Sequence, residues 1–172
     1  HAVSDCGIPQ ELKHLQEEST DVNKPTEAGH TLLHEAILHS MEDMVRLLLD
    51  YGADADQAST TRPGFAPLHD AAREGYYRGV IFLLAKGANV NIDTLNGSTP
   101  LMRATCGGHL KVMDLLIKAG ASLTAVNNEG LDALGVAYRY NKRAAAELLI
   151  KAAEERARRE DKIRADNAIA RA

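Results

Sequence analysis

Apolar and polar positions follow one another with helical spacing in short blocks along the chain. In the first clear block, Ala36 and Ile37 follow Leu33 by three and four positions, and a second block with the same spacing follows a few residues later. Such spacing places the apolar side chains on one side of a helix. The pattern therefore predicts short paired helices that each bury one side. The predicted inward-facing residues are Leu33, Ala36, Ile37, Met44, Val45, Leu48, Leu49, Leu68, Ala71, Ala72, Val80, Leu83, Leu84, Leu101, Ala104, Val112, Met113, Leu116, Ile117, Leu134, Ala137, Leu148, Leu149 and Ile150.

Two landmarks recur in register with these blocks. The turn glycines Gly29, Gly64, Gly97 and Gly130 are 35, 33 and 33 residues apart, and each precedes a helix start such as Pro-Leu-His-Asp-Ala-Ala. The helix pairs end in related segments: Gly-Ala-Asp-Ala-Asp, Gly-Ala-Asn-Val-Asn and Gly-Ala-Ser-Leu-Thr. A period near 33 residues indicates a repeat array, in which each unit packs only on its neighbours.

With its Thr-Pro-Leu-His-x-Ala variants and glycine exits, the chain resembles the ankyrin-repeat family. The resemblance implies an all-α ankyrin-repeat solenoid of helix-turn-helix units with β-hairpin finger loops. The expected repeats are residues 24–56, 57–91, 92–124 and 125–151.

Both ends depart from the repeat. Residues 1–23 are interpreted as a truncated capping repeat, because Asn23 lies six residues before Gly29, as Asn91 lies six before Gly97. Ala153 stands where a glycine would stop the last helix, so this helix is expected to run on into residues 152–172. Those residues are rich in Ala, Arg and Glu, and favour either a solvated cap and tail, which solenoids require at their ends, or a docking helix.

The second finger loop, residues 57–63, carries two residues more than the later ones and is rich in Ser and Thr. Two interpretations stay open. Surface insertions cost little free energy, so the extra length can be neutral drift. Loops also carry binding residues more often than cores do, so the finger can contact a partner.

No catalytic or metal-binding constellation emerges. His34 and His39 are five residues apart, about 140° around a helix, whereas the zinc motif needs a spacing of four. The family resemblance instead implies that His34 and His69 hydrogen-bond the finger backbone. His69 and Asp70 have no third partner at a useful spacing. We therefore predict no metal, no cofactor and no enzymatic activity.

Composition narrows the class of partner. The net charge of −4 does not favour nucleic acid, and no run approaches the 18 apolar residues of a membrane span. Cys6 and Cys106 are expected to lie far apart, and free thiols favour a reducing compartment. We expect a cytoplasmic protein that is a monomer when free. Because the chain begins at His1 rather than Met, a periplasmic or secreted protein with a removed export signal is the alternative.

By analogy with the family, the surface formed by fingers and first helices is expected to bind another protein. Arginine and aromatic residues carry most binding energy at interfaces, and Phe65 and Leu131 suggest an exposed apolar row. The candidate residues are His30, His39, Arg62, Phe65, Arg73, Glu74, Leu95, Arg103, Leu131, Arg139 and Tyr140. The protein would act as an adaptor, or would occlude a partner such as an enzyme. The alternative is a structural fragment of a larger multidomain protein.

Overall fold

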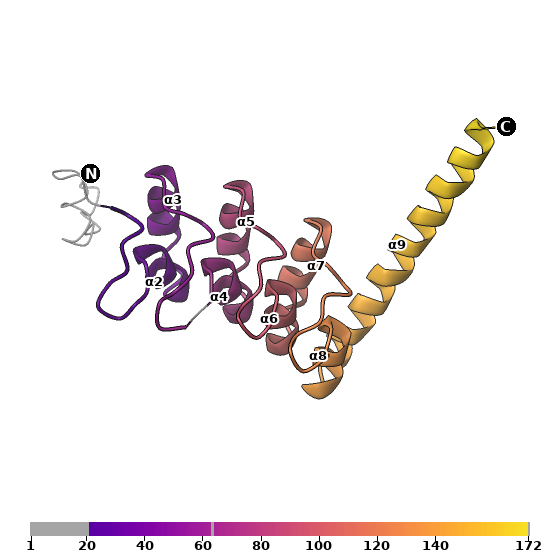
Figure 1. Cartoon of the computed structure of the whole chain (residues 1–172). Helices are drawn as coiled ribbons and strands as arrows, with labels where there is room; N and C mark the ends of the chain where they lie inside the picture. Colours follow the sequence, from indigo (N-terminus) through magenta and orange to yellow (C-terminus); the bar gives the residue numbers. More distant parts are fainter. Residues whose placement is uncertain (1–20, 63, 172) are drawn as a thin grey trace, which may run out of the picture.

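The computed structural model describes residues 21–62 and 64–171, and this part of the chain is entirely helical apart from its loops. Helix pairs stand side by side in a row, and the last helix projects away from the row's end (Figure 1). The helices are α2 (Leu32–Leu38), α3 (Glu42–Asp50), α4 (Pro67–Glu74), α5 (Tyr77–Ala85), α6 (Pro100–Gly107), α7 (Leu110–Lys118), α8 (Ala133–Arg139) and α9 (Arg143–Ala170). The predicted all-α class is confirmed. The predicted capping repeat before residue 21 lies outside the described residues.

Local sequence explains where the first helix of each pair begins. Thr31, Thr99 and Asp132 each precede a helix and accept a hydrogen bond from the backbone N–H three residues later. Such a cap satisfies one of the free N–H groups of the first turn. In α4 and α6 a proline occupies the first position, where no backbone N–H is needed.

The turn inside each helix pair needs a left-handed residue. Gly75 and Gly108 fill this position with φ of 68° and 74°, and Ser40 and Asn141 fill it in the other two pairs, both with φ of 52°. A side chain at positive φ costs free energy, although Asn tolerates it better than most residues. The first pair is therefore turned by a serine in a strained conformation.

The predicted inward residues form one continuous core along the array. Leu33, Leu48, Leu83 and Leu101 are almost completely buried, and the core continues from repeat to repeat between them. Ile150 is the exception, because its side chain is 41% exposed. It lines a hollow at the last helix pair together with Ala137 of α8 and Ala146 of α9, and no further helix pair of the described residues covers it.

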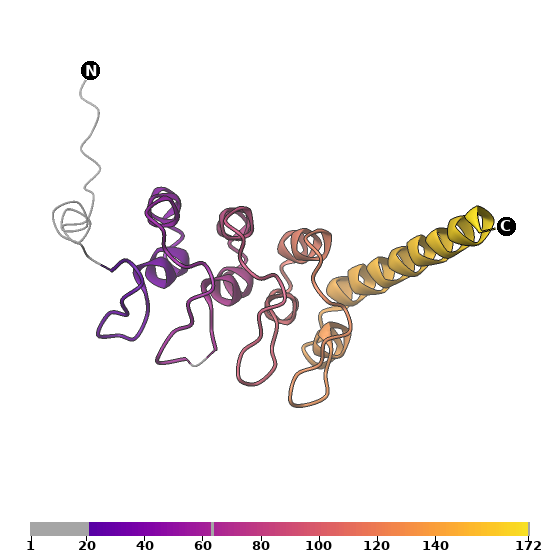
Figure 2. The same ribbon diagram turned by 45° about the horizontal axis from the view of Figure 1, so that its top comes forward.

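The helices form two rows. The first helices α2, α4, α6 and α8 lie next to the loops, and α3, α5, α7 and α9 form the outer row (Figure 2). Each first helix packs against its own partner and against the first helices beside it. The four loops that turn at Gly29, Gly64, Gly97 and Gly130 project to the same side as the first helices. We call these loops the fingers, and the surface that they form with the first helices the finger face.

Side chains at the helix exits link successive repeats. Asn23 accepts a hydrogen bond from the Asp54 N–H at 2.7 Å, and Asn91 accepts one from the Ser122 N–H at 2.7 Å. Asp56 occupies the equivalent position between them and accepts from the Asn89 N–H at 3.0 Å. One acceptor at a fixed position in the repeat therefore satisfies a backbone donor of the next repeat.

The last helix, α9, runs without interruption from Arg143 to Ala170. Its first turns bury Ala145, Ala146 and Leu149 against α7 and α8. Arg156 then donates from Nη2 to the Ala121 carbonyl at 2.7 Å and lies 3.4 Å from that of Ile117. Beyond this contact the helix is exposed on all sides. None of the described helices has the combination of length and apolarity needed to cross a membrane.

Candidate protein-binding surface

Each finger is a hairpin closed by one cross-hairpin hydrogen bond. The bond joins Thr26 N–H to His30 O in the first finger, Thr94 to Ser98 in the third and Asn127 to Leu131 in the fourth, at 2.8 to 3.1 Å. In the second finger it joins Ser59 to Phe65, six residues apart rather than four, which accommodates the two extra residues. The described parts of the fingers contain no residue pairs in regular strand conformation, so these are hairpin-like loops rather than strand ladders.

The two signature histidines hold the fingers of the following repeats. In α2, His34 Nε2 lies 3.0 Å from the Phe65 carbonyl, and in α4, His69 Nε2 lies 3.0 Å from the Ser98 carbonyl. Because a carbonyl can only accept, Nε2 carries the proton in both rings. The Nδ1 atom then accepts a backbone N–H, from Ala66 at 3.1 Å in the case of His69. The prediction that these histidines bind finger backbone is confirmed.

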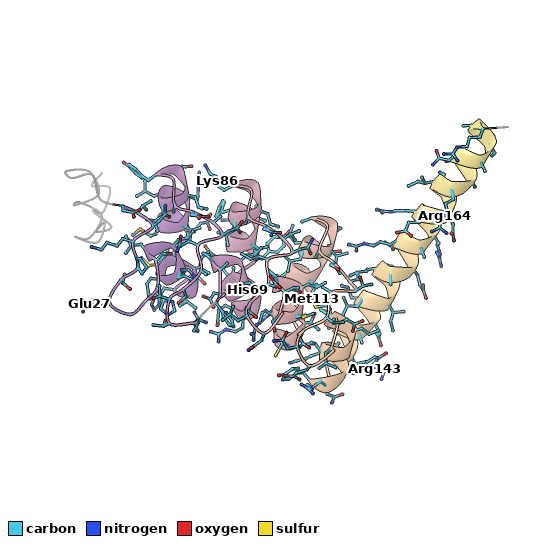
Figure 3. All side chains as sticks on the ribbon, in the orientation of Figure 1. Glu27, His69, Lys86, Met113, Arg143 and Arg164 are labelled. Carbon is cyan, nitrogen blue, oxygen red and sulfur yellow. The ribbon has the colours of Figure 1, made fainter. Side chains whose placement is uncertain are left out.

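Burial keeps both imidazoles neutral. His69 lies within the row of helices (Figure 3) and is completely buried. Desolvation lowers its pKa from 6.5 to about 4, against a smaller opposing effect of the bond to Ser98. The same desolvation lowers the pKa of His34. These two neutral histidines use both ring nitrogens in hydrogen bonds that position the backbone of the finger face.

The extra length of the second finger is used to brace the first. The Thr60 N–H and the hydroxyls of Ser59 and Thr60 all donate to the Gly29 carbonyl, at 2.8 to 3.1 Å. The Thr61 hydroxyl donates to the Ala28 carbonyl at 3.1 Å. The Ser and Thr residues that distinguish this finger therefore bind a neighbouring finger of the same chain.

An ion pair fixes the other side of the second finger. The Arg62 guanidinium donates through both terminal nitrogens to the two carboxylate oxygens of Asp70, each at 2.8 Å. The Asp70 side chain is completely buried, while that of Arg62 is 28% exposed. In the sequence, His69 and Asp70 have no third partner at a spacing that would make a site. The contact between Arg62 and Asp70 depends on the path of the finger between them. Residue spacing alone does not predict that path.

Two guanidinium groups lie close to the Phe65 ring. The Arg62 carbon Cζ is 5.2 Å from its ring centroid, and that of Arg103 is 4.6 Å away, both within the range of cation–π attraction. Phe65 and Leu131 are both half-buried, and Leu131 packs against the core. The predicted exposed apolar row is therefore wrong: arginine covers the first side chain and the last helix pair covers the second.

Four of the predicted residues surround one hollow of about 390 Å³ between the third and fourth repeats. Arg103 comes from α6, Leu131 from the fourth finger, and Arg139 and Tyr140 from the end of α8. Arg139 pairs with Glu129, and both of these side chains line the hollow together with Cys106. The remaining lining residues include the polar finger side chains Asn96, Ser98, Asn127 and Asn128.

The other predicted residues are spread over the finger face. Leu95, on the third finger, is 73% exposed. In α4, Arg73 pairs with the adjacent Glu74 at 2.7 Å. The remaining two residues lie near the start of the array. His30 is half-buried and stacks edge-on against His34, and His39 is exposed 3.7 Å from Glu35.

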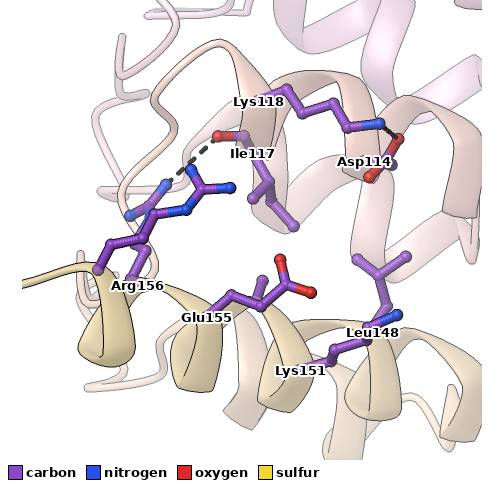
Figure 4. Close-up of a pocket in the computed structure, with 9 residues that line it drawn as sticks. Asp114, Ile117, Lys118, Leu148, Lys151, Glu155 and Arg156 are labelled. Carbon is purple, nitrogen blue, oxygen red and sulfur yellow. Dashed lines mark hydrogen bonds and ion pairs between the residues drawn. The ribbon is translucent and has the colours of Figure 1, made fainter. Parts of the chain in front are cut away.

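A second hollow, of about 290 Å³, lies on the outer row between α7 and α9 (Figure 4). Arg156 crosses one end of it to the Ile117 carbonyl, and Lys118 pairs with Asp114 at 2.6 Å on the other side. Lys151, Glu155 and Arg159 also line this hollow, so most of its lining side chains are charged. In residues 21–62 and 64–171, no group of three or more His, Cys, Asp or Glu side chains is placed to hold a metal ion.

Stacked helix pairs with fingers braced from one repeat to the next define a helical repeat scaffold. This class of protein generally serves protein–protein interaction. The family model described as ankyrin repeats (3 copies) matches residues 1–94 and 89–160. The chain belongs to the ankyrin-repeat family. Such repeats are typically non-catalytic.

Relatives from animals and bacteria contain similar repeats. The chain is 36% identical over 103 residues to the B-cell lymphoma 3 protein homolog of Mus musculus, covering 60% of this chain and 23% of that protein. It is 33% identical over 138 residues to Rabankyrin-5 of Mus musculus, covering 74% and 12%. It is 35% identical over 114 residues to Protein PhlB of Serratia liquefaciens, covering 66% and 49%. The chain thus spans less than half the length of each of these relatives.

Proposed function

We propose that this chain is a non-enzymatic protein-binding module whose finger face covers a surface of a partner protein, as an adaptor or by occluding the partner. The proposal rests mainly on the hollow between the third and fourth repeats, which gathers Arg103, Leu131, Arg139 and Tyr140. Arginine and tyrosine are the residue types that most often dominate binding energy at interfaces.

Bracing of the fingers supports this proposal. Histidine bonds from α2 and α4 hold the second and third fingers, and the Asn128 N–H donates to the Asn96 carbonyl at 3.0 Å between the third and fourth. A face that is ordered before binding loses less conformational entropy when it meets a partner. The proposed contact residues are His30, His39, Arg62, Phe65, Arg73, Glu74, Leu95, Arg103, Leu131, Arg139 and Tyr140.

Paired alanine variants test which face binds. One variant carries Leu95→Ala and Tyr140→Ala on the finger face, and its control carries Tyr51→Ala and Ile81→Ala, at the end of α3 and within α5. Tyr140 and Tyr51 are exposed to nearly the same extent, 52% and 51%. Circular dichroism checks that both variants are folded. Wild type and each variant are then used as bait in lysate of the source organism, and the amount of each captured protein is measured.

A partner retained by wild type and by the control, but lost from the finger-face variant, is the expected result. Loss from the control alone would place binding on the outer row and contradict the proposal. If the captured partner is an enzyme, its turnover is then measured with and without this protein. Turnover should fall if the finger face occludes the active site, and it should stay unchanged if the protein is an adaptor.

The alternative proposal is that this chain is the ankyrin segment of a larger multidomain protein. It is supported by the chain's coverage of the relatives, which is 49% for the bacterial protein and 12% for Rabankyrin-5. Immunoblotting of the native lysate with an antibody against the array decides this point. A band well above 18.6 kDa favours the larger protein.

A further inference from the structure

Arg103 differs from the other arginines of the finger face in having no carboxylate partner. Arg62 pairs with Asp70, Arg73 with Glu74 and Arg139 with Glu129. Among the described residues, no acidic side chain pairs with Arg103, and its guanidinium makes no hydrogen bond to them. Arg103 is therefore a cation of the finger face without a directly bonded carboxylate, and the nearby charge of Asp70, which Arg62 already pairs, acts on it only through space.

This cation is also partly removed from water. Arg103 is half-buried, and its Nε atom is fully buried without a hydrogen-bond partner. Desolvation lowers the pKa of the guanidinium, and the nearby charge of Arg73 adds to this effect. A buried donor without a partner costs free energy that an incoming acceptor would recover. The Arg103 Cζ lies 4.6 Å from the Phe65 ring centroid, so its guanidinium sits over this ring, and the residue lines the hollow.

We propose that the hollow between the third and fourth repeats receives an aspartate or glutamate side chain from an extended segment of the partner protein, with Arg103 as its counter-ion. This inference rests on the proposed binding role of the finger face and adds the chemistry of the contact. A planar guanidinium binds a carboxylate through two parallel hydrogen bonds, a geometry that lysine cannot reproduce.

The amide side chains that line the hollow favour an extended segment, because the backbone of such a segment has free N–H and C=O groups to pair. The amide side chains of Asn96, Asn127 and Asn128 line the same hollow. Amides both donate and accept hydrogen bonds, so they can satisfy the backbone on either side of an inserted acidic residue.

An array of random peptides, acetylated and amidated so that only side chains are charged, tests this proposal. Wild type should retain peptides enriched in Asp or Glu at one position. In the best peptide, replacing that Glu by Gln should weaken binding in solution about tenfold or more, as expected for a close charge pair at an interface. Arg103→Met should weaken binding to a similar extent, and the two changes together should cost little more than either alone.

Controls separate this inference from the proposed function. Arg78→Met removes an exposed arginine of α5 that pairs with Glu42, and it should leave binding unchanged. Peptides that bind without acidic preference, but depend on Leu95 and Tyr140, would overturn the inference and leave the binding role intact. Equal losses from Arg103→Met and Arg78→Met would overturn the inference, as would retention of no peptide. Binding that needs a free C-terminal carboxylate in a second, unamidated array would reassign Arg103 to chain ends.

Discussion

Both carboxylate oxygens of Asp70 accept hydrogen bonds from Arg62, at 2.8 Å each, across the base of the longest finger. The carboxylate is completely buried, so Arg62 is its electrostatic complement in the described part of the chain. A residue predicted as a partner contact therefore also stabilises the finger that presents it.

Arg62→Ala should lower the free energy of unfolding by about 3 kcal/mol, because it leaves a buried carboxylate without a counter-ion. Urea denaturation followed by circular dichroism measures this change. Arg78→Ala is the matched control, because its two bonds to Glu42 are equally short but lie on the exposed outer row. That substitution should cost less than about 1 kcal/mol. Equal costs would show that burial of Asp70 contributes nothing.

Stability should decline as the pH falls from 7 towards 4. The pKa of His69 is about 4 in the folded chain and about 6.5 when unfolded. Between these values the unfolded state binds a proton that the folded state does not, so the free energy of unfolding falls with pH. The full shift corresponds to about 3 kcal/mol. The lowered pKa of His34 acts in the same direction.

Replacing His69 by Gln should flatten this pH dependence, while lowering stability at pH 7 through loss of the bond to Ser98. The control is His39→Gln, since His39 is exposed and bonds no finger. Thermal unfolding between pH 7 and 4.5 compares the three proteins. An unchanged slope in His69→Gln would mean that other groups set the pH dependence.

Gly64 and Gly130 stand at the same position in two fingers but should respond differently to alanine. Both have positive φ, 80° and 73°, so each substitution carries a strain of about 1 kcal/mol. A Cβ at Gly64 would also lie 2.7 Å from the Leu95 nitrogen and 2.9 Å from the Thr94 Cα, whereas one at Gly130 would meet nothing within 4 Å. Denaturation should therefore show a clearly larger loss, or failure to fold, only for Gly64→Ala.

Ser40→Gly should leave stability unchanged or raise it by up to about 1 kcal/mol. Glycine removes the left-handed strain of a side chain at φ 52°, and this gain is partly offset by the greater entropy of glycine in the unfolded chain. Gly75 shows that the equivalent turn accepts glycine. Thermal unfolding measures the shift, and a marked loss of stability would mean that the serine side chain makes a contribution of its own.

The helix pairs and the core could be predicted from sequence because both depend on local spacing. Leu33 and Leu48 face inward because of the spacing of apolar residues within their own repeat. Ile150 has the same local pattern, but no further helix pair covers it in the described part of the chain. The histidine contacts were available only through the family resemblance.

The conformations of the fingers were not predictable in this way. The Ser and Thr residues of the second finger bond to Gly29 and Ala28, some thirty residues earlier, and the Arg62 contact to Asp70 depends on the path of that loop. The hollow around Arg103 likewise combines side chains from two repeats, so its unpaired charge emerges only from their relative placement.

Because α9 is one continuous helix, its buried first turns fix the direction in which the side chains of its last turns point. The helix spans 28 residues, about 42 Å at the usual rise, and each residue turns it by about 100°. Ile163 and Ile169, both exposed, therefore point in directions set by the register of the buried Ala145 and Leu149. Inserting one alanine after Ala157 would rotate both isoleucines by about a quarter turn and advance them by only about 1.5 Å. In the distal part of α9, the direction in which a side chain points can therefore be changed with almost no change in its distance from the array.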